Sequence, residues 1–209
     1  MAHVVYVHGL WMPGNESLIL RRRLAHDFAL TLHAFRYSAA ATTMSVIAAR
    51  LESFVQQLNP SELHFVGHSL GGLVIYRYLE RFPAQPPGRV AFLGTPCVAS
   101  RAAQSAGRFA PIAHFMGRSV AEELLQPRTR HWTHARPLGV VAGSQPLGVG
   151  QLLAQFDEPN DGTIAVRETR MPGATDHIVL PVSHLGMLVS ARVAREVGLF
   201  LTQGHFSLR

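Results

Sequence analysis

The sequence predicts an α/β fold, a three-layer α/β/α sandwich with about six mostly parallel strands. Short apolar runs rich in Val, Ile and Leu alternate with longer segments in which apolar residues recur at helical spacing. Alternating strands and helices form right-handed βαβ units, which align the strands in parallel and cover both faces of the sheet. A chain of 209 residues suits one such unit, so residues 1–209 are expected to form a single domain.

Six segments are predicted to be strands because each is a short apolar run next to turn-forming or polar residues. They are residues 4–8, 31–37, 63–67, 90–93, 138–142 and 176–180. Helices are predicted where apolar residues recur every three to four positions near a capping or stop residue. They are residues 15–28 with Asn15 as N-cap, 43–58 before Pro60, 70–82 before Pro83, and 185–201. Residues 97–136 are expected to form a short irregular or cap-like segment.

Composition and charge exclude several classes of protein. Hydrophobic residues make up 47% of the chain and charged residues 15%, which is typical of a folded protein and excludes a disordered one. No apolar run is long enough to span a bilayer, so stable membrane insertion is not expected. The formal net charge is +6, but the arginines are scattered and no nucleic-acid-binding motif is present, so no nucleic-acid partner is expected. The chain contains no lysine, which excludes a lysine Schiff base.

The single cysteine bears on location. Cys97 has no second cysteine with which to form an internal disulfide, and the first residues lack the features of a secretory signal. A cytoplasmic location is therefore expected. Neither composition nor charge indicates an oligomeric state.

A Gly-x-Ser-x-Gly pattern centred on Ser69 is the strongest chemical signal. Gly-His-Ser-Leu-Gly-Gly at 67–72 lies between a predicted strand and a predicted helix. Such a sharp turn raises the serine hydroxyl above the sheet, and the glycines two positions away remove Cβ atoms that would collide. The N-terminus of the following helix favours developing negative charge. Ser69 is therefore the predicted nucleophile, and the alternative is a glycine-rich turn with an incidental serine.

The end of the first predicted strand is the candidate oxyanion loop. Residues 4–7 lead into His8, Gly9, Leu10 and Trp11. Acyl transfer builds a negative oxygen that backbone N–H groups can stabilise. Leu70, which follows the nucleophile, is expected to supply one N–H, and Leu10 the other, with Trp11 as the next candidate. His8 is interpreted as structural, holding the loop through a hydrogen bond.

A histidine late in the chain is the candidate general base. His184 lies on the predicted loop between the strand at 176–180 and the helix at 185–201, where it can reach the carboxyl edge of the sheet. The chain has 12 histidines, so position rather than residue type supports this choice. His177 is the main competitor but is interpreted as a strand residue, and His205 lies in the tail.

The candidate acid is Asp161 in Asn-Asp-Gly-Thr-Ile at 160–164. A histidine base needs a carboxylate on its other ring nitrogen, which fixes the tautomer and stabilises the imidazolium. Asp161 comes after the serine and before the histidine in the chain, the order that α/β-hydrolases use. Rival acids are Asp157, Glu158 and Asp176, and Asp157 is close enough to remain an alternative. Asp161 is otherwise explained as a turn residue.

These segments, taken in chain order, resemble the α/β-hydrolase superfamily, in particular small bacterial lipases and esterases. The matching pieces are Val-His-Gly-Leu at 7–10, Gly-His-Ser-Leu-Gly-Gly at 67–72, Leu-Gly-Thr-Pro at 93–96, Asn-Asp-Gly-Thr-Ile at 160–164 and Ser-His-Leu-Gly-Met at 183–187. The resemblance implies a serine carboxylic-ester hydrolase that acts on a small-molecule or lipid ester, needs no cofactor and forms an acyl-enzyme. Its Ser-His-Asp triad would be Ser69, His184 and Asp161, with Leu10 and Leu70 as oxyanion donors.

The chain departs from the family in three places. The strand at 4–8 corresponds to the family's third strand, which predicts a minimal α/β-hydrolase fold. Cys97 stands where Gly-Thr-Pro is usually followed by histidine. The region between the nucleophile helix and the acid is short, which predicts no large lid and argues against interfacial activation.

Other readings of the sequence stay open. The same triad could serve a thioesterase or an acyltransferase. A hydrolase scaffold can also be a non-catalytic binding protein, and the net positive charge suits a protein that binds anionic surfaces. No metal site is predicted, because His131 and His134 form a single pair without an evident third ligand.

Overall fold

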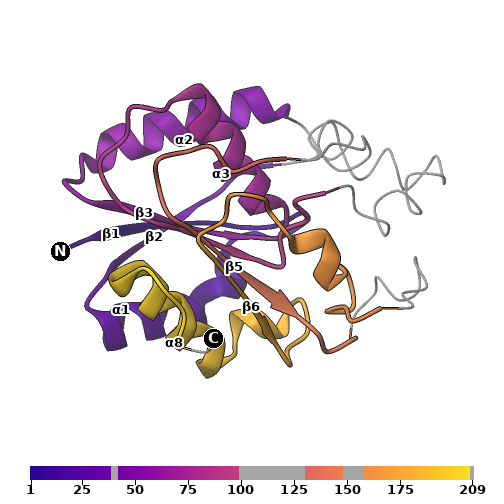
Figure 1. Ribbon diagram of the computed structural model, residues 1–209. Helices are drawn as coiled ribbons and strands as arrows, with labels where there is room; N and C mark the ends of the chain where they lie inside the picture. The colour runs from indigo at the N-terminus through magenta and orange to yellow at the C-terminus, as the bar shows by residue number, and fades with distance from the viewer. Residues whose placement is uncertain (39–41, 99–129, 148–157, 208–209) are drawn as a thin grey trace.

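A computed structural model describes residues 1–38, 42–98, 130–147 and 158–207. Within them, six strands form one sheet in the order β2-β1-β3-β4-β5-β6, and every pairing is parallel (Figure 1). The strands are β1 (His3–Val7), β2 (Thr31–Phe35), β3 (Leu63–His68), β4 (Val90–Leu93), β5 (Leu138–Gly143) and β6 (Asp176–Leu180). The predicted α/β fold with about six parallel strands is confirmed.

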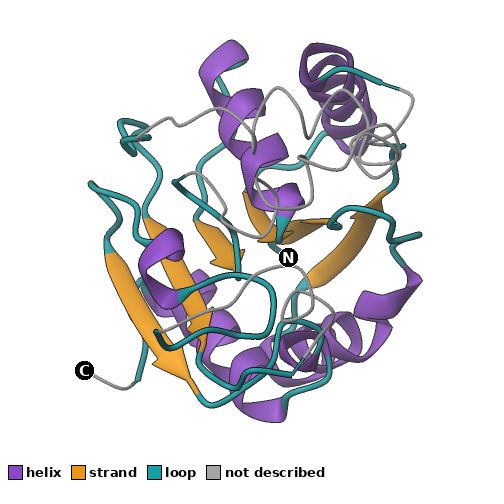
Figure 2. Ribbon diagram, turned by 90° about the vertical axis from the view of Figure 1, so that its right-hand side faces the viewer, coloured by secondary structure: helices purple, strands orange, loops and turns teal. Residues whose placement is uncertain are grey.

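Helices cover both faces of this sheet. α2 (Met44–Leu58) and α3 (Leu70–Arg81) pack together on one face, and α1 (Leu18–Phe28) and α8 (Ala191–Gln203) pack together on the other. Figure 1 shows the first pair above the strands and the second pair below, and Figure 2 shows the same layers after a quarter turn. None of the helices in the described ranges is long and apolar enough to cross a membrane.

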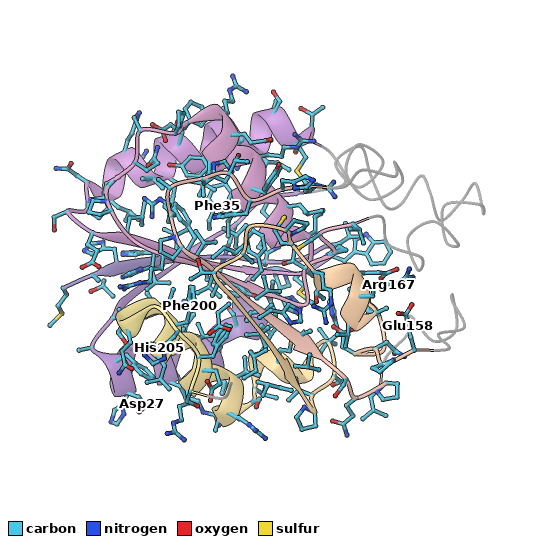
Figure 3. All side chains as sticks on the ribbon, viewed as in Figure 1. Asp27, Phe35, Glu158, Arg167, Phe200 and His205 are labelled. Atoms are coloured by element: carbon cyan, nitrogen blue, oxygen red, sulfur yellow. The ribbon has the colours of Figure 1, made fainter. Side chains whose placement is uncertain are left out.

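The strands alternate their side chains between two apolar cores. In β1, Val5 and Val7 face α2 and α3, whereas Val4 and Tyr6 face α1 and α8. This period of two follows from the pleat of a strand, and burial on both faces explains why the central strands are mainly apolar. Figure 3 labels a residue of each core: Phe35 on the α2 side and Phe200 on the α8 side.

The order of the strands determines where a ligand site can form. β1 lies between β2 and β3, so the chain passes through α1 on one face and then through α2 on the other. In open parallel sheets of this kind, ligands bind outside the carboxyl ends of the strands where the winding reverses. The carboxyl ends of β1 and β3 meet at this point, and the predicted oxyanion loop and nucleophile follow directly after them.

Two helix predictions need correction. Asn15 is not the N-cap of α1, because it opens a 3₁₀ turn, Asn15–Ser17, before the helix, and its side chain accepts a hydrogen bond from Arg36. The predicted helix at 185–201 is two elements, a 3₁₀ turn at Gly186–Leu188 followed by α8. The break occurs because the Ser190 side chain accepts the backbone N–H of Val193 and so starts a new helix.

The predicted cap-like segment at 97–136 falls mostly on residues 99–129, which lie outside the described residues. The prediction that the protein has no large lid concerns the same undescribed residues. The described part, residues 97–98 and 130–136, contains neither a helix nor a strand.

Two buried histidines predict that the protein loses stability in mild acid. Burial lowers the pKa of His64 to about 4 and that of His68 to about 3, from an ordinary 6.5. Below pH 6.5 the unfolded chain therefore binds protons that the native state does not bind. This stabilisation is complete above pH 6.5 and is lost as the pH falls toward the folded pKa values. Each histidine is expected to lower the free energy of unfolding by on the order of 1–2 kcal/mol between pH 6.5 and pH 5.

Urea denaturation at pH 7 and pH 5 measures this loss. His64→Asn should show a weaker pH dependence, because the amide does not titrate and its oxygen can accept the Arg89 N–H that His64 Nδ1 now accepts at 2.9 Å. His26→Asn is the matched control, since His26 is exposed. An unfolding free energy that is equal at both pH values, or an unchanged pH dependence in His64→Asn, would contradict the prediction.

Candidate active site

Ser69 occupies the sharp turn between β3 and α3. Its backbone has φ 54° and ψ −125°, a region that non-glycine residues rarely adopt and that costs about 1–3 kcal/mol. The turn is held by the Ser69 N–H, which donates to the Leu93 carbonyl at the end of β4, and by the Gly72 N–H, which donates to the Ser69 carbonyl. The predicted strand–turn–helix setting of Ser69 is therefore present.

The glycines around Ser69 are required by close packing. A Cβ on Gly67 would lie 2.5 Å from the Gly72 Cα, and a Cβ on Gly71 would lie 2.1 Å from the Val7 carbonyl oxygen. A Cβ on Gly72 would lie 2.2 Å from the Thr95 hydroxyl. These glycines let the first turn of α3 sit directly on the ends of β1 and β4, which brings the serine to the edge of the sheet.

Asp161 and His184 form a buried pair beyond the ends of β5 and β6. His184 Nδ1 lies 2.7 Å from Asp161 Oδ2, and the two side chains are 7% and 0% exposed. The His184 backbone N–H also donates to the Asp161 carbonyl. Since the carboxylate accepts, Nδ1 carries a proton, and in the neutral imidazole this leaves Nε2 with the lone pair.

The other oxygen of Asp161 holds the loop that carries it. Oδ1 accepts the backbone N–H groups of Thr163 and Ile164 at 2.9 and 2.7 Å. Asp161 is thus both a turn residue and the partner of His184, so the two interpretations of its role are compatible. Its Cβ packs against the end of β5, where a Cβ on Gly143 would lie 2.7 Å away.

Gly94 connects this pair to the serine turn. It has φ +55°, and a Cβ there would lie 2.9 Å from both Asp161 Oδ2 and His184 Nδ1. Its neighbour Leu93 accepts the Ser69 N–H. The end of β4 is therefore next to all three predicted triad members: the Leu93 carbonyl holds the Ser69 backbone, and the missing side chain of Gly94 makes room for Asp161 and His184. The Leu-Gly-Thr-Pro motif was the sequence signal for this position, but its contact with the acid and base was not predicted.

The loop after β1 approaches the serine from the opposite side. A Cβ on Gly9 would lie 3.0 Å from the Ser69 Cβ. His8 is buried, and its Nδ1 lies 2.8 Å from the Gly9 carbonyl while its Nε2 accepts the Tyr37 backbone N–H. Its ring also stacks on Tyr37, with centroids 4.3 Å apart. These contacts agree with the structural role predicted for His8.

His8 also fixes the direction of the Leu10 N–H. In a trans peptide the carbonyl and the following N–H point in opposite directions. Because His8 holds the Gly9 carbonyl, the Leu10 N–H points away from His8. Leu70 opens α3, and the first N–H groups of a helix have no acceptor within it. Trp11, the next candidate, has φ 58° and is two-thirds exposed.

The rival acids and bases that the structure describes bond elsewhere. Glu158 pairs with Arg167, as Figure 3 shows, and the Asp176 carboxylate accepts the backbone N–H groups of His177 and Phe206. His177 Nε2 lies 3.0 Å from the Thr169 hydroxyl. Asp157 lies outside the described residues.

Two other residues from the sequence analysis, His205 and Cys97, lie in the described part of the chain. His205 is exposed, as expected for a tail residue. Burial raises the pKa of the Cys97 thiol to about 12, which keeps it protonated and unreactive. Over the described parts of the chain, no group of three or more His, Cys, Asp or Glu side chains is placed to hold a metal ion.

Comparisons with known proteins agree with this architecture. Residues 13–156 match the family described as alpha/beta hydrolase fold. A search of curated proteins found no match. Among solved structures, Bacillus licheniformis lipase BlEst2 in mature form has a TM-score of 0.71 at 20% identity, covering 95% of this chain and 90% of that one.

Two further structures are similar. Carboxylesterase CesB (YbfK) from Bacillus subtilis has a TM-score of 0.64 at 15% identity, covering 98% of this chain and 85% of that one. RedJ, a thioesterase from the prodiginine biosynthetic pathway in Streptomyces coelicolor, has a TM-score of 0.63 at 14% identity, covering 96% and 90%. These structures share the fold, and the family match covers more than half of the sequence, so the chain belongs to the alpha/beta hydrolase fold family.

Proposed function

We propose that the protein is a serine hydrolase that cleaves carboxylic esters through Ser69, His184 and Asp161 by way of an acyl-enzyme. The observation that carries this proposal is the buried hydrogen bond of 2.7 Å between His184 Nδ1 and Asp161 Oδ2, next to the strained turn at Ser69. A nucleophile, a base and a group that orients the base are the parts that such catalysis needs. All three lie past the carboxyl ends of strands of one parallel sheet, Ser69 after β3, Asp161 after β5 and His184 after β6.

The first half of the reaction acylates the serine. His184 takes the Ser69 proton on Nε2 as Oγ attacks the ester carbonyl, and Asp161 stabilises the imidazolium that forms. The Leu10 and Leu70 N–H groups stabilise the negative oxygen of the tetrahedral intermediate. His184 then returns the proton to the departing alcohol, leaving the acyl group on Ser69.

The second half regenerates the enzyme. Water attacks the acyl-enzyme, and His184 accepts its proton and then returns it to Ser69 as the carboxylic acid leaves. Each half forms a tetrahedral intermediate, so each half needs the same oxyanion donors. The contact between His8 and the Gly9 carbonyl keeps the Leu10 N–H in the same direction in both halves. No metal or organic cofactor enters either half.

A thioesterase is the second candidate, because the same triad attacks a thioester carbonyl. One structure similar to this chain is a thioesterase, whereas others are a lipase and a carboxylesterase. An acyltransferase would differ only in the acceptor of the acyl group. A non-catalytic protein on this scaffold is the remaining alternative, and the buried Asp161–His184 pair argues against it.

A labelling experiment and a substrate panel test the proposal together. A fluorophosphonate probe should label the wild type once per chain, and peptide mapping should place the label on Ser69. p-Nitrophenyl esters of graded acyl length, assayed beside acyl-thioesters, should show hydrolysis of oxygen esters at the higher kcat/KM. Preference for thioesters would select the thioesterase. No labelling and no turnover on any acyl donor would overturn the enzyme assignment.

A further inference from the structure

His68 lies between the serine turn and the candidate base. It is the last residue of β3, directly before Ser69, and its side chain is fully buried. Its ring centroid lies 4.6 Å from that of His184, with the ring planes at 46°. Its Nε2 lies 2.9 Å from the His184 carbonyl oxygen. Because a carbonyl only accepts, Nε2 carries the proton of the His68 ring.

This hydrogen bond completes the fixation of the His184 backbone. The His184 N–H donates to the Asp161 carbonyl, and the His184 carbonyl accepts from His68. The peptide groups on both sides of the candidate base are therefore held, one from the acid loop and one from the serine strand. The two residues are 116 positions apart in the chain, so this bond ties the loop after β6 to the turn after β3.

Space filling alone does not explain a histidine at position 68. His68 Nδ1 is buried without a hydrogen-bond partner among the described residues. A buried acceptor without a partner costs about 1–3 kcal/mol. Phenylalanine would fill a similar volume without that cost, so the Nε2 donor is what distinguishes histidine here. Burial and the neighbouring His184 lower the pKa of His68 and keep its ring neutral beside the imidazolium of the reaction.

We infer that His68 is a positioning residue that sets the orientation of His184 toward Ser69, through its Nε2–H to the His184 carbonyl and its ring contact. The inference rests on the proposed role of His184 as general base. It concerns rate rather than substrate binding, because a misdirected base slows both proton transfers while the binding surface for the ester is unchanged.

Three substitutions separate the donor from the ring. His68→Gln keeps an N–H donor at about the reach of Nε2, whereas the shorter side chain of His68→Asn places its amide near Nδ1. His68→Phe keeps the ring and loses the donor. We expect kcat to fall about 10²-fold in the Phe and Asn variants with KM nearly unchanged, and to recover to within several-fold of wild type in His68→Gln.

A second readout does not depend on hydrolysis. The His184 Nδ1 proton shared with Asp161 should give a far-downfield proton NMR signal in water, assigned by its absence in His184→Asn. We expect this signal to persist in His68→Gln and to broaden or disappear in His68→Phe and His68→Asn. Thermal melts identify any variant that does not fold, and the Gln and Asn pair keeps the test decisive if Phe fails to fold.

The two readouts distinguish the possible failures. If folded His68→Phe and His68→Asn keep wild-type kcat and the downfield signal, the positioning role is wrong while the proposed function stands. The role is also wrong if folded His68→Gln is as impaired as His68→Asn. If the wild type hydrolyses no acyl donor, the proposed function fails, and the NMR series alone decides whether His68 orients His184.

Discussion

Ser69→Ala is expected to lower kcat for p-nitrophenyl butyrate by on the order of 10⁶-fold. Alanine has no oxygen to attack the carbonyl, so no acyl-enzyme can form. The oxyanion donors and the substrate-binding surface remain, so a residual rate of roughly 10³–10⁴-fold over water is expected. Initial rates and the loss of fluorophosphonate labelling measure the effect.

Stability should separate this loss from unfolding. Alanine keeps the Cβ of serine, and the backbone bond from residue 69 to the Leu93 carbonyl is unaffected, so the melting temperature should stay close to that of the wild type. Ser53→Ala on the exposed face of α2 is the matched control and should keep full activity. If Ser69→Ala retained a kcat within tenfold of wild type, Ser69 would not be the nucleophile.

Asp161→Asn is expected to lower kcat by about 10⁴-fold while the protein stays folded. The amide oxygen can keep the bonds from the Thr163 and Ile164 backbone, which places the amide nitrogen opposite His184 Nδ1. A donor at that position favours the tautomer with its proton on Nε2, which cannot accept the proton of Ser69. Steady-state kinetics with a short-chain ester measures the loss.

Two matched variants test whether this position is the acid. Asp176→Asn changes a carboxylate that bonds only the backbone N–H groups of His177 and Phe206 in the described structure, so its kcat should stay near wild type. Asp157→Asn tests the alternative acid from the sequence. If Asp157→Asn loses activity and Asp161→Asn does not, the acid assignment must move to Asp157.

The strands at the centre of the sheet could be predicted because each is a short, mainly apolar run that is buried on both faces. Two predicted ranges, 90–93 and 176–180, match β4 and β6 in full. Helix starts were harder, because a capping side chain acts through geometry that composition does not reveal. Asn15 has the right residue type for a cap but bonds Arg36, whereas Ser190 breaks a stretch whose apolar spacing is continuous.

The candidate site could be predicted in part, because its residues follow strands that could themselves be predicted. Chain order and strand ends pointed to Ser69, Asp161 and His184, and the structure places Asp161 against His184 beside the turn that carries Ser69. The contacts made by His68 and Gly94 were not predicted. Both depend on distances between loops that are far apart in sequence, and a variable position inside Gly-x-Ser-x-Gly carries no signal of its partner.

The reversal of winding at β1 distinguishes the backbone that the site needs from the connecting segments that can be altered. The close approach of Gly9 to Ser69 arises from the path of the backbone through the neighbouring strands β1 and β3. The connections that follow β4 and β5 start from the same rim and carry two residues of the site, Gly94 and Asp161. Insertions or exchanges in those connections that leave Gly94 and Asp161 in place are expected to change acyl selectivity while the reacting atoms keep their frame, which makes them the natural place to begin directed evolution of selectivity.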